Sequence, residues 1–143
     1  MKLVYLDNAA TTPVDKEVID VMHQSMLENN GNPSSTHQFG RRAKASVETA
    51  RKNIAKHFNV SASEIIFTAG GTEADNLILQ NAVTNLGVEV IITSKIEHHA
   101  VLHTCNYLKE AHQIEIVYVD VESNGNININ HLEKLLENNK GKK

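Results

Sequence analysis

Short apolar runs alternate with segments of helical periodicity over residues 65–119, and this alternation restricts the fold more than any other feature of the sequence. The runs are rich in β-branched side chains and too short for helices, which is typical of buried strands. The predicted strands are residues 65–68, 88–93 and 114–119, and the predicted helices between them are residues 72–86 and 98–111. Strands that alternate with helices pair in parallel. The sequence therefore predicts an α/β fold in which a parallel-dominated sheet is flanked by helices.

The remainder of the chain is predicted to be helical with turns. Residues 15–27 and a second segment that ends near Asn59 carry apolar side chains at steps of three and four, which indicates amphipathic helices. Residues 29–35 between them are dense in Asn, Gly, Pro and Ser, which predicts a loop. A short helix is expected to begin near Asn130 and to end before Asn138. Another strand is due after it, so we expect an incomplete sheet whose partner strands lie outside the sequence.

Composition excludes several classes of function. A length of 143 residues, with 41% apolar and 22% charged residues, suits one soluble domain over residues 1–143. The net charge of −3 gives no reason to expect binding to nucleic acid or to an anionic membrane. No apolar run approaches the roughly 18 residues that span a bilayer. Cys105 is alone and cannot form an internal disulfide, which favours a reducing compartment and a cytoplasmic location.

The segment FTAGGTEADN at residues 67–76 is the strongest local motif. It is predicted to comprise the end of a strand, a glycine turn and the start of a helix. In a parallel sheet, ligands bind beyond the carboxyl ends of the strands, and a helix amino terminus there presents unpaired N–H groups that suit phosphate. The backbone at Gly71 can approach a ligand closely, and the Thr72 hydroxyl can donate to a phosphate oxygen. The spacing fits neither the dinucleotide pattern nor the P-loop.

A purely structural interpretation of the same motif stays open. Thr72 could cap the helix, with Asp75 three residues later as a poor substitute for the Glu of a capping box. The carboxylates of Glu73 and Asp75 would repel a phosphate unless they point away from it. They also complement the helix dipole, so they do not decide between the two interpretations.

Histidines follow the next predicted strand, at the same ligand-facing edge. His98 could stack on a flat cofactor or move a proton near neutral pH. His99 and His103 stand four residues apart on one helix face, which is also a spacing found in metal sites. A third ligand is not obvious, so the predicted site contains no metal, and a metal-binding module stays an alternative. Cys105 is predicted to be an inert thiol in the core.

Four segments together resemble cysteine desulfurases of the class V aminotransferase group. They are YLDNAATTP at residues 5–13, GNPSSTHQFG at residues 31–40, FTAGGTEADN at residues 67–76 and EHHAVL at residues 97–102. Their order is that of the family, and they cover essentially the whole chain. Each motif alone is weak, whereas the set is specific.

The resemblance implies part of the large domain of a fold-type I enzyme that depends on pyridoxal 5′-phosphate. Such an enzyme takes sulfur from L-cysteine and leaves alanine and an enzyme persulfide, for iron–sulfur cluster or thiocofactor assembly. Gly71 and Thr72 would hold the cofactor phosphate, and His98 would stack on the pyridine ring and take part in catalysis. The resemblance also implies a homodimer and a sulfur acceptor or scaffold protein as partner.

Several residues that the family uses have no match here. The resemblance implies four features that have no match in this sequence: a Schiff-base lysine in a Ser-x-His-Lys setting, an aspartate that pairs with the pyridine nitrogen, an Asn-Asn-Glu segment and a persulfide-forming cysteine. Cys105 does not match the surroundings of that cysteine, and no Lys follows a His. We therefore expect an amino-terminal fragment that is inactive alone. The alternatives are a fragment of a selenocysteine lyase or of another class V enzyme, and a non-catalytic interaction module.

Overall fold

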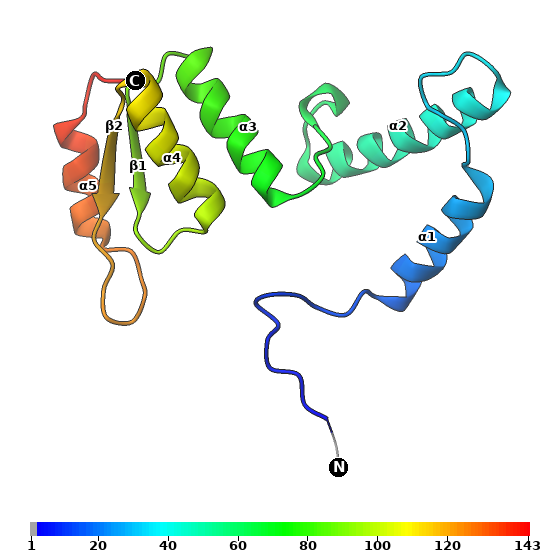
Figure 1. Cartoon of the computed structure of the whole chain (residues 1–143), viewed down its shortest axis with the longest axis horizontal. Helices are drawn as coiled ribbons and strands as arrows, with labels where there is room; N and C mark the ends of the chain where they lie inside the picture. Colours follow the sequence, from blue (N-terminus) through cyan, green and yellow to red (C-terminus); the bar gives the residue numbers. More distant parts are fainter. Residues whose placement is uncertain (1–2) are drawn as a thin grey trace. The chain divides into compact units, whose positions relative to one another are not determined.

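The computed structural model describes residues 3–143, which form two compact units that divide between Ile66 and Phe67 (Figure 1). The first unit is helical, and the second is built around a small sheet. No helix within the described residues is long and apolar enough to cross a membrane.

Two helices, both predicted, form most of the first unit. Helix α1 spans Lys16–Glu28 and begins where the Asp15 carboxylate accepts a 2.9 Å hydrogen bond from the Glu17 N–H. Helix α2 spans Gln38–Phe58 and ends at Asn59, whose φ of 55° is the left-handed conformation that often terminates helices. A 3₁₀ turn, η1, follows at Ala62–Glu64. Both predicted helices are confirmed within one or two residues of their expected ends.

The predicted loop between α1 and α2 closes tightly on the start of α2. A Cβ atom at Gly40 would lie 2.3 Å from the Ser35 carbonyl oxygen and 2.7 Å from that of Asn32. Both oxygens belong to the backbone and cannot move aside without displacing the loop. Glycine at residue 40 therefore allows the loop and the helix to approach each other.

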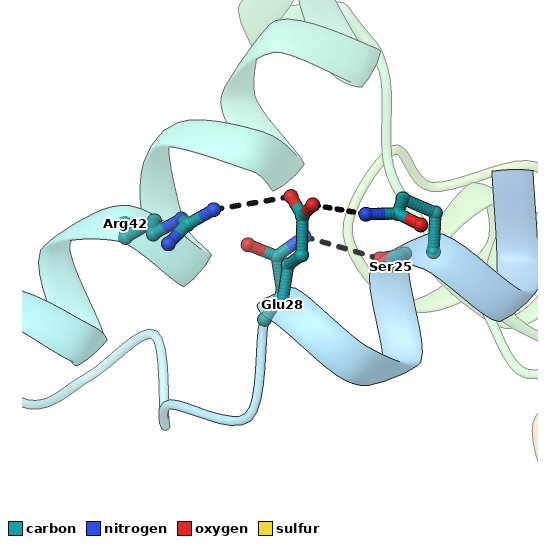
Figure 2. A network of polar contacts seen from close by, with 5 residues as sticks. Ser25, Glu28 and Arg42 are labelled. Carbon is teal, nitrogen blue, oxygen red and sulfur yellow. Dashed lines mark hydrogen bonds and ion pairs between the residues drawn. The ribbon is translucent and has the colours of Figure 1, made fainter.

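The facing ends of α1 and α2 are joined by an ion pair, in which Arg42 Nη2 lies 3.1 Å from Glu28 Oε2 (Figure 2). Both side chains are about half exposed, so the pair contributes at most about 1 kcal/mol. Helix α1 has no buried residue, and its apolar side chains, such as Val18 and Met26, are exposed. The periodicity of α1 thus indicates a helix whose apolar face is not covered within the described residues.

The second unit contains the parallel sheet. Strand β1 (Val90–Ser94), helix α4 (His99–His112) and strand β2 (Glu115–Val119) form a βαβ unit with β1 and β2 in parallel register. Helix α3 (Gly71–Thr84) packs on α4, and both α4 and helix α5 (Ile129–Asn138) contact β2 (Figure 1). These strands and helices confirm the α/β class and the predicted alternation from residue 88 onward.

The core of the second unit lies where α3, α4 and the sheet meet. Leu108 and Cys105 of α4 are completely buried. The main cluster consists of Val83, Leu108 and Ile114, against which Leu79, Val88, Ile91 and Ile116 pack. This packing fixes α4 against α3, and it thereby fixes the ends of both helices where the predicted site residues lie.

One predicted strand is wrong. Residues 65–68 are extended but join no sheet, and the sheet within the described residues has two strands rather than about three. The Ile65 carbonyl accepts a hydrogen bond from the Arg51 guanidinium, and Ile66 and Phe67 are 68% and 48% exposed rather than buried. An extended segment becomes a strand only beside a partner strand. No described strand lies beside this segment.

Candidate cofactor-binding site

A cavity of about 540 Å³ lies between α3 and α4. This volume is in the range of small-molecule sites. Its lining residues are Thr72, Asn76, Gln80, His98, His99, Ala100, His103, Thr104 and Tyr107. Two of the three predicted site residues, Thr72 and His98, therefore share one pocket although 26 positions separate them in the sequence. Gly71 lies at the first position of α3, beside Thr72, and is exposed.

The start of α3 is open toward a ligand. The helix begins at Gly71, and its cap residue Gly70 offers no side chain to the first N–H groups. By position the N–H groups of Gly71 and Thr72 have no acceptor inside the helix. A Cβ atom at either Gly70 or Gly71 would meet nothing within 4 Å, so the space before these amides is free. Two open N–H groups at the positive end of a helix dipole suit an anion.

The capping-box interpretation of this motif is wrong. Thr72 is the second residue of α3 rather than its cap, and no side chain caps the helix. The Glu73 carboxylate instead accepts a 2.6 Å hydrogen bond from the N–H of Ala69, in the turn before the helix. Glu73 therefore closes the turn, and the amides of Gly71 and Thr72 have no acceptor among the described residues.

His98 is the cap residue of α4. Its Nδ1 accepts a 3.1 Å hydrogen bond from the Ala100 N–H. An imidazole that accepts at Nδ1 carries its proton at Nε2 when it is neutral. The bond fixes the ring in the lining of the pocket and leaves Nε2 available to a ligand. The capping role of His98 was not predicted, and the signal for it was its place directly before a helical segment.

Two residues that the sequence did not single out connect the halves of the pocket. Asn76 donates a 2.8 Å hydrogen bond from Nδ2 to the Thr72 carbonyl, and its Oδ1 lies 2.8 Å from the hydroxyl of Thr104 on α4. Thr104 is 5% exposed. The spacing of Asn76, four residues after Thr72, was the available signal, because it places both residues on one helix face.

The charge of the pocket comes from dipoles and imidazoles. Its lining contains three histidines and no Lys, Arg, Asp or Glu. Among residues 3–143, no three or more His, Cys, Asp or Glu side chains are grouped as metal ligands. Cys105 of α4 is buried, and burial, followed by the charge of Glu97, raises the pKa of its thiol. Cys105 is thus a core residue, as predicted.

The comparisons with known proteins agree with this architecture. The family model for aminotransferase class V matches residues 4–141, and the chain belongs to this family. The chain is 45% identical over 135 residues to the cysteine desulfurase IscS of Dictyoglomus turgidum. The matched segment covers 93% of this chain and 34% of that protein.

Solved structures of similar proteins give the same result. A NifS-like protein has a TM-score of 0.81 and 42% identity, over 90% of this chain and 35% of that one. The structure described as SspA in complex with cysteine has a TM-score of 0.76 and 34% identity, over 88% of this chain and 37% of that one. The chain spans about a third of the length of the curated relatives it matches. The fold is therefore that of the amino-terminal part of such enzymes.

Proposed function

We propose that the chain is the amino-terminal part of a cysteine desulfurase that depends on pyridoxal 5′-phosphate. The observation that carries the proposal is the shared pocket of Thr72 and His98, next to the open amides at the start of α3. The similarity to cysteine desulfurases over more than nine-tenths of the chain supports the same conclusion.

The residues of the pocket fit this cofactor. Its phosphate would meet the N–H groups of Gly71 and Thr72 and the Thr72 hydroxyl, where a Cβ-free backbone leaves room. Its flat ring would lie against the imidazole of His98, which the bond to Ala100 fixes in orientation. When bound, pyridoxal phosphate supplies an electron sink for the chemistry at the substrate's α-carbon.

His98 is the residue of this chain that we assign to catalysis. Its Nε2 carries a proton in the neutral ring and faces no hydrogen-bond partner among the described residues. An imidazole in this position can donate and take up a proton near neutral pH. Thr72 and Gly71 bind the cofactor, and they hold it so that the ring reaches His98.

The remaining roles follow from the proposed activity. The substrate is L-cysteine, and a similar solved structure is described as a complex with cysteine. The products are alanine and an enzyme persulfide, whose sulfur passes to an acceptor or scaffold protein for iron–sulfur cluster or thiocofactor assembly. The complete enzyme is proposed to be a cytoplasmic homodimer. A selenocysteine lyase is the second candidate, because it would use the same pocket with a selenium-bearing substrate.

A chimera tests the proposal. Residues 1–143 replace the matching segment of the Dictyoglomus turgidum cysteine desulfurase, to which they are 45% identical. We expect the chimera to release alanine from L-cysteine, and we expect His98→Ala to lower kcat by about 100-fold or more. A chimera that folds and binds the cofactor but forms no alanine would contradict the proposal. Activity on L-selenocysteine but not on L-cysteine would favour the second candidate.

The isolated chain is expected to be inactive, because it has no lysine in the Schiff-base setting of the family. With pyridoxal phosphate and L-cysteine, it should form no more sulfide and alanine than the free cofactor forms. Production above that control would refute this part of the proposal.

A further inference from the structure

We propose that His99 and His103 form a two-imidazole site for a divalent transition metal ion on the exposed face of α4. The two histidines line the same cavity as Thr72 and His98, so the site is that of the chain without the proposed cofactor. It would hold an ion such as Cu²⁺ by two ring nitrogens, with water in the remaining coordination positions.

The geometry of the two rings carries the proposal. His99 and His103 are one helical turn apart, and their ring centres lie 5.2 Å from each other with the planes tilted by 42°. A metal about 2.1 Å from one nitrogen of each ring would lie roughly 3.2 Å from each ring centre. Because the two ring centres are 5.2 Å apart, less than twice that distance, one ion can contact a nitrogen of each ring.

Exposure and preorganisation favour binding. Both side chains are exposed and line the cavity between α3 and α4, so an ion can reach them with its water ligands. Helix α4 fixes the spacing of the two residues before any ion arrives, which reduces the entropy lost on binding. The completely buried Leu108 anchors the same helix in the core.

His98 does not act as a third ligand in this arrangement. Its ring centre lies 6.3 Å from that of His99, but its Nδ1 already accepts the hydrogen bond from Ala100. The other nitrogen, Nε2, then carries the proton of the neutral ring, and a metal binds an imidazole only at an unprotonated nitrogen. The site therefore has two protein ligands, in agreement with the lack of any group of three or more metal-ligating side chains among residues 3–143.

Cu²⁺ is the best probe of such a site. Among divalent first-row metals it binds nitrogen ligands most tightly, and it tolerates a mixture of imidazole and water ligands. Its electron paramagnetic resonance spectrum also reports the nitrogens bound to it. We expect one Cu²⁺ per chain to bind more tightly than any other, with two imidazole nitrogens.

Three variants test the assignment by calorimetric titration with Cu²⁺. His99→Gln and His103→Gln should each weaken the tightest site about 10-fold or more, because one chelating ligand is lost. His112→Gln is the matched control, because His112 is an exposed histidine of the same helix. It should leave the tightest site unchanged. Circular dichroism establishes that each variant keeps its helices.

The results separate the possibilities. Loss of the tightest site in both His99→Gln and His103→Gln, but not in His112→Gln, supports the proposal. Equal weakening in all three variants, or no weakening in either test variant, overturns it. A third imidazole nitrogen that disappears in His98→Gln would overturn the two-ligand assignment.

Discussion

The hydroxyl of Thr104 lies 2.8 Å from the amide oxygen of Asn76, and this contact joins α4 to α3 in the lining of the pocket. The same hydroxyl lies 2.7 Å from the carbonyl oxygen of Ala100, so its single hydrogen is shared between two acceptors. Asn76 in turn donates to the carbonyl of Thr72. A chain of polar contacts therefore runs from the buried face of α4 to the first turn of α3, where the open amides lie.

Replacing Thr104 by Val tests this link. Valine keeps the shape of the side chain but removes the donor to Asn76 Oδ1, which then keeps only a 3.4 Å contact from Gln80 Nε2. The loss of one such hydrogen bond costs about 0.5–1.5 kcal/mol. We expect Thr104→Val to lower the free energy of unfolding by this amount in a urea titration. Thr84→Val is the matched control, because the Thr84 hydroxyl also bonds to the carbonyl four residues earlier but is exposed. Equal effects of the two substitutions would show that the Asn76 contact is not stabilising.

For a substitution of Ser94 we expect the free energy of unfolding to change in the opposite direction. Its side chain is 1% exposed at the end of β1, and its Oγ has no hydrogen-bond partner among the described residues. A buried hydroxyl without a partner is destabilising, and its removal leaves no polar group behind. We therefore expect Ser94→Ala to leave the free energy of unfolding unchanged or to raise it by about 1 kcal/mol. A loss of more than about 1 kcal/mol would mean that the hydroxyl has a partner after all.

Leu108 is the centre of the core of the second unit. It is completely buried and packs with Val83 and Ile114. Leu108→Ala should lower the free energy of unfolding by about 2–5 kcal/mol, because it removes buried methyl groups and leaves a cavity. Leu136→Ala on α5, where the side chain is 56% exposed, should cost far less. Thermal unfolding of the pair gives the comparison, and similar losses would contradict the core described here.

Cys105 should react slowly with iodoacetamide in the folded chain. Burial, and to a smaller extent the charge of Glu97, raises the pKa of its thiol, so less thiolate is present at any given pH. At pH 8 we expect alkylation to be about 100-fold or more slower in buffer than in concentrated urea. Similar rates in the two solutions would show that α4 does not bury the thiol.

The raised pKa also fixes a sign for the dependence of stability on pH. Because the thiol ionises more readily in the unfolded chain, its contribution favours the fold below pH 9.0, the ordinary pKa of the thiol. That contribution is lost as the pH rises through the folded pKa. Cys105→Ala should therefore show a smaller alkaline loss of stability than the parent chain.

The sequence predicted the helices and two of the strands because their signals are local. Periodicity indicated α4, and β-branched runs indicated β1 and β2. The strand predicted at residues 65–68 failed for a reason that is not local. A strand needs a neighbouring strand to pair with, and the residue types at Ile65 and Phe67 do not indicate whether such a strand is present.

Part of the candidate site could likewise be predicted from local sequence, and part could not. Gly71, Thr72 and His98 were predicted from motifs and from their position after predicted strands, although the segment before Gly71 joins no sheet. The capping role of His98 and the contact between Asn76 and Thr104 were missed, because they depend on how α3 packs against α4. Sequence spacing placed Asn76 on the same face as Thr72, but it could not identify a partner 28 residues away.

The central claim is that the amides of Gly71 and Thr72 bind a phosphate while the ring of His98 contacts the attached pyridine. Pyridoxine 5′-phosphate is the probe, because it lacks the aldehyde that would react with surface lysines. Pyridoxine, without the phosphate, is the matched control.

A titration followed by ¹⁵N–¹H correlation spectra gives the most direct measurement. With pyridoxine 5′-phosphate, the account predicts the largest amide shifts at Gly71 and Thr72, together with shifts of the His98 ring. With pyridoxine, it predicts weaker binding in which those two amides hardly shift. If the two amides remain unchanged at saturating pyridoxine 5′-phosphate while other residues shift, the claim is contradicted.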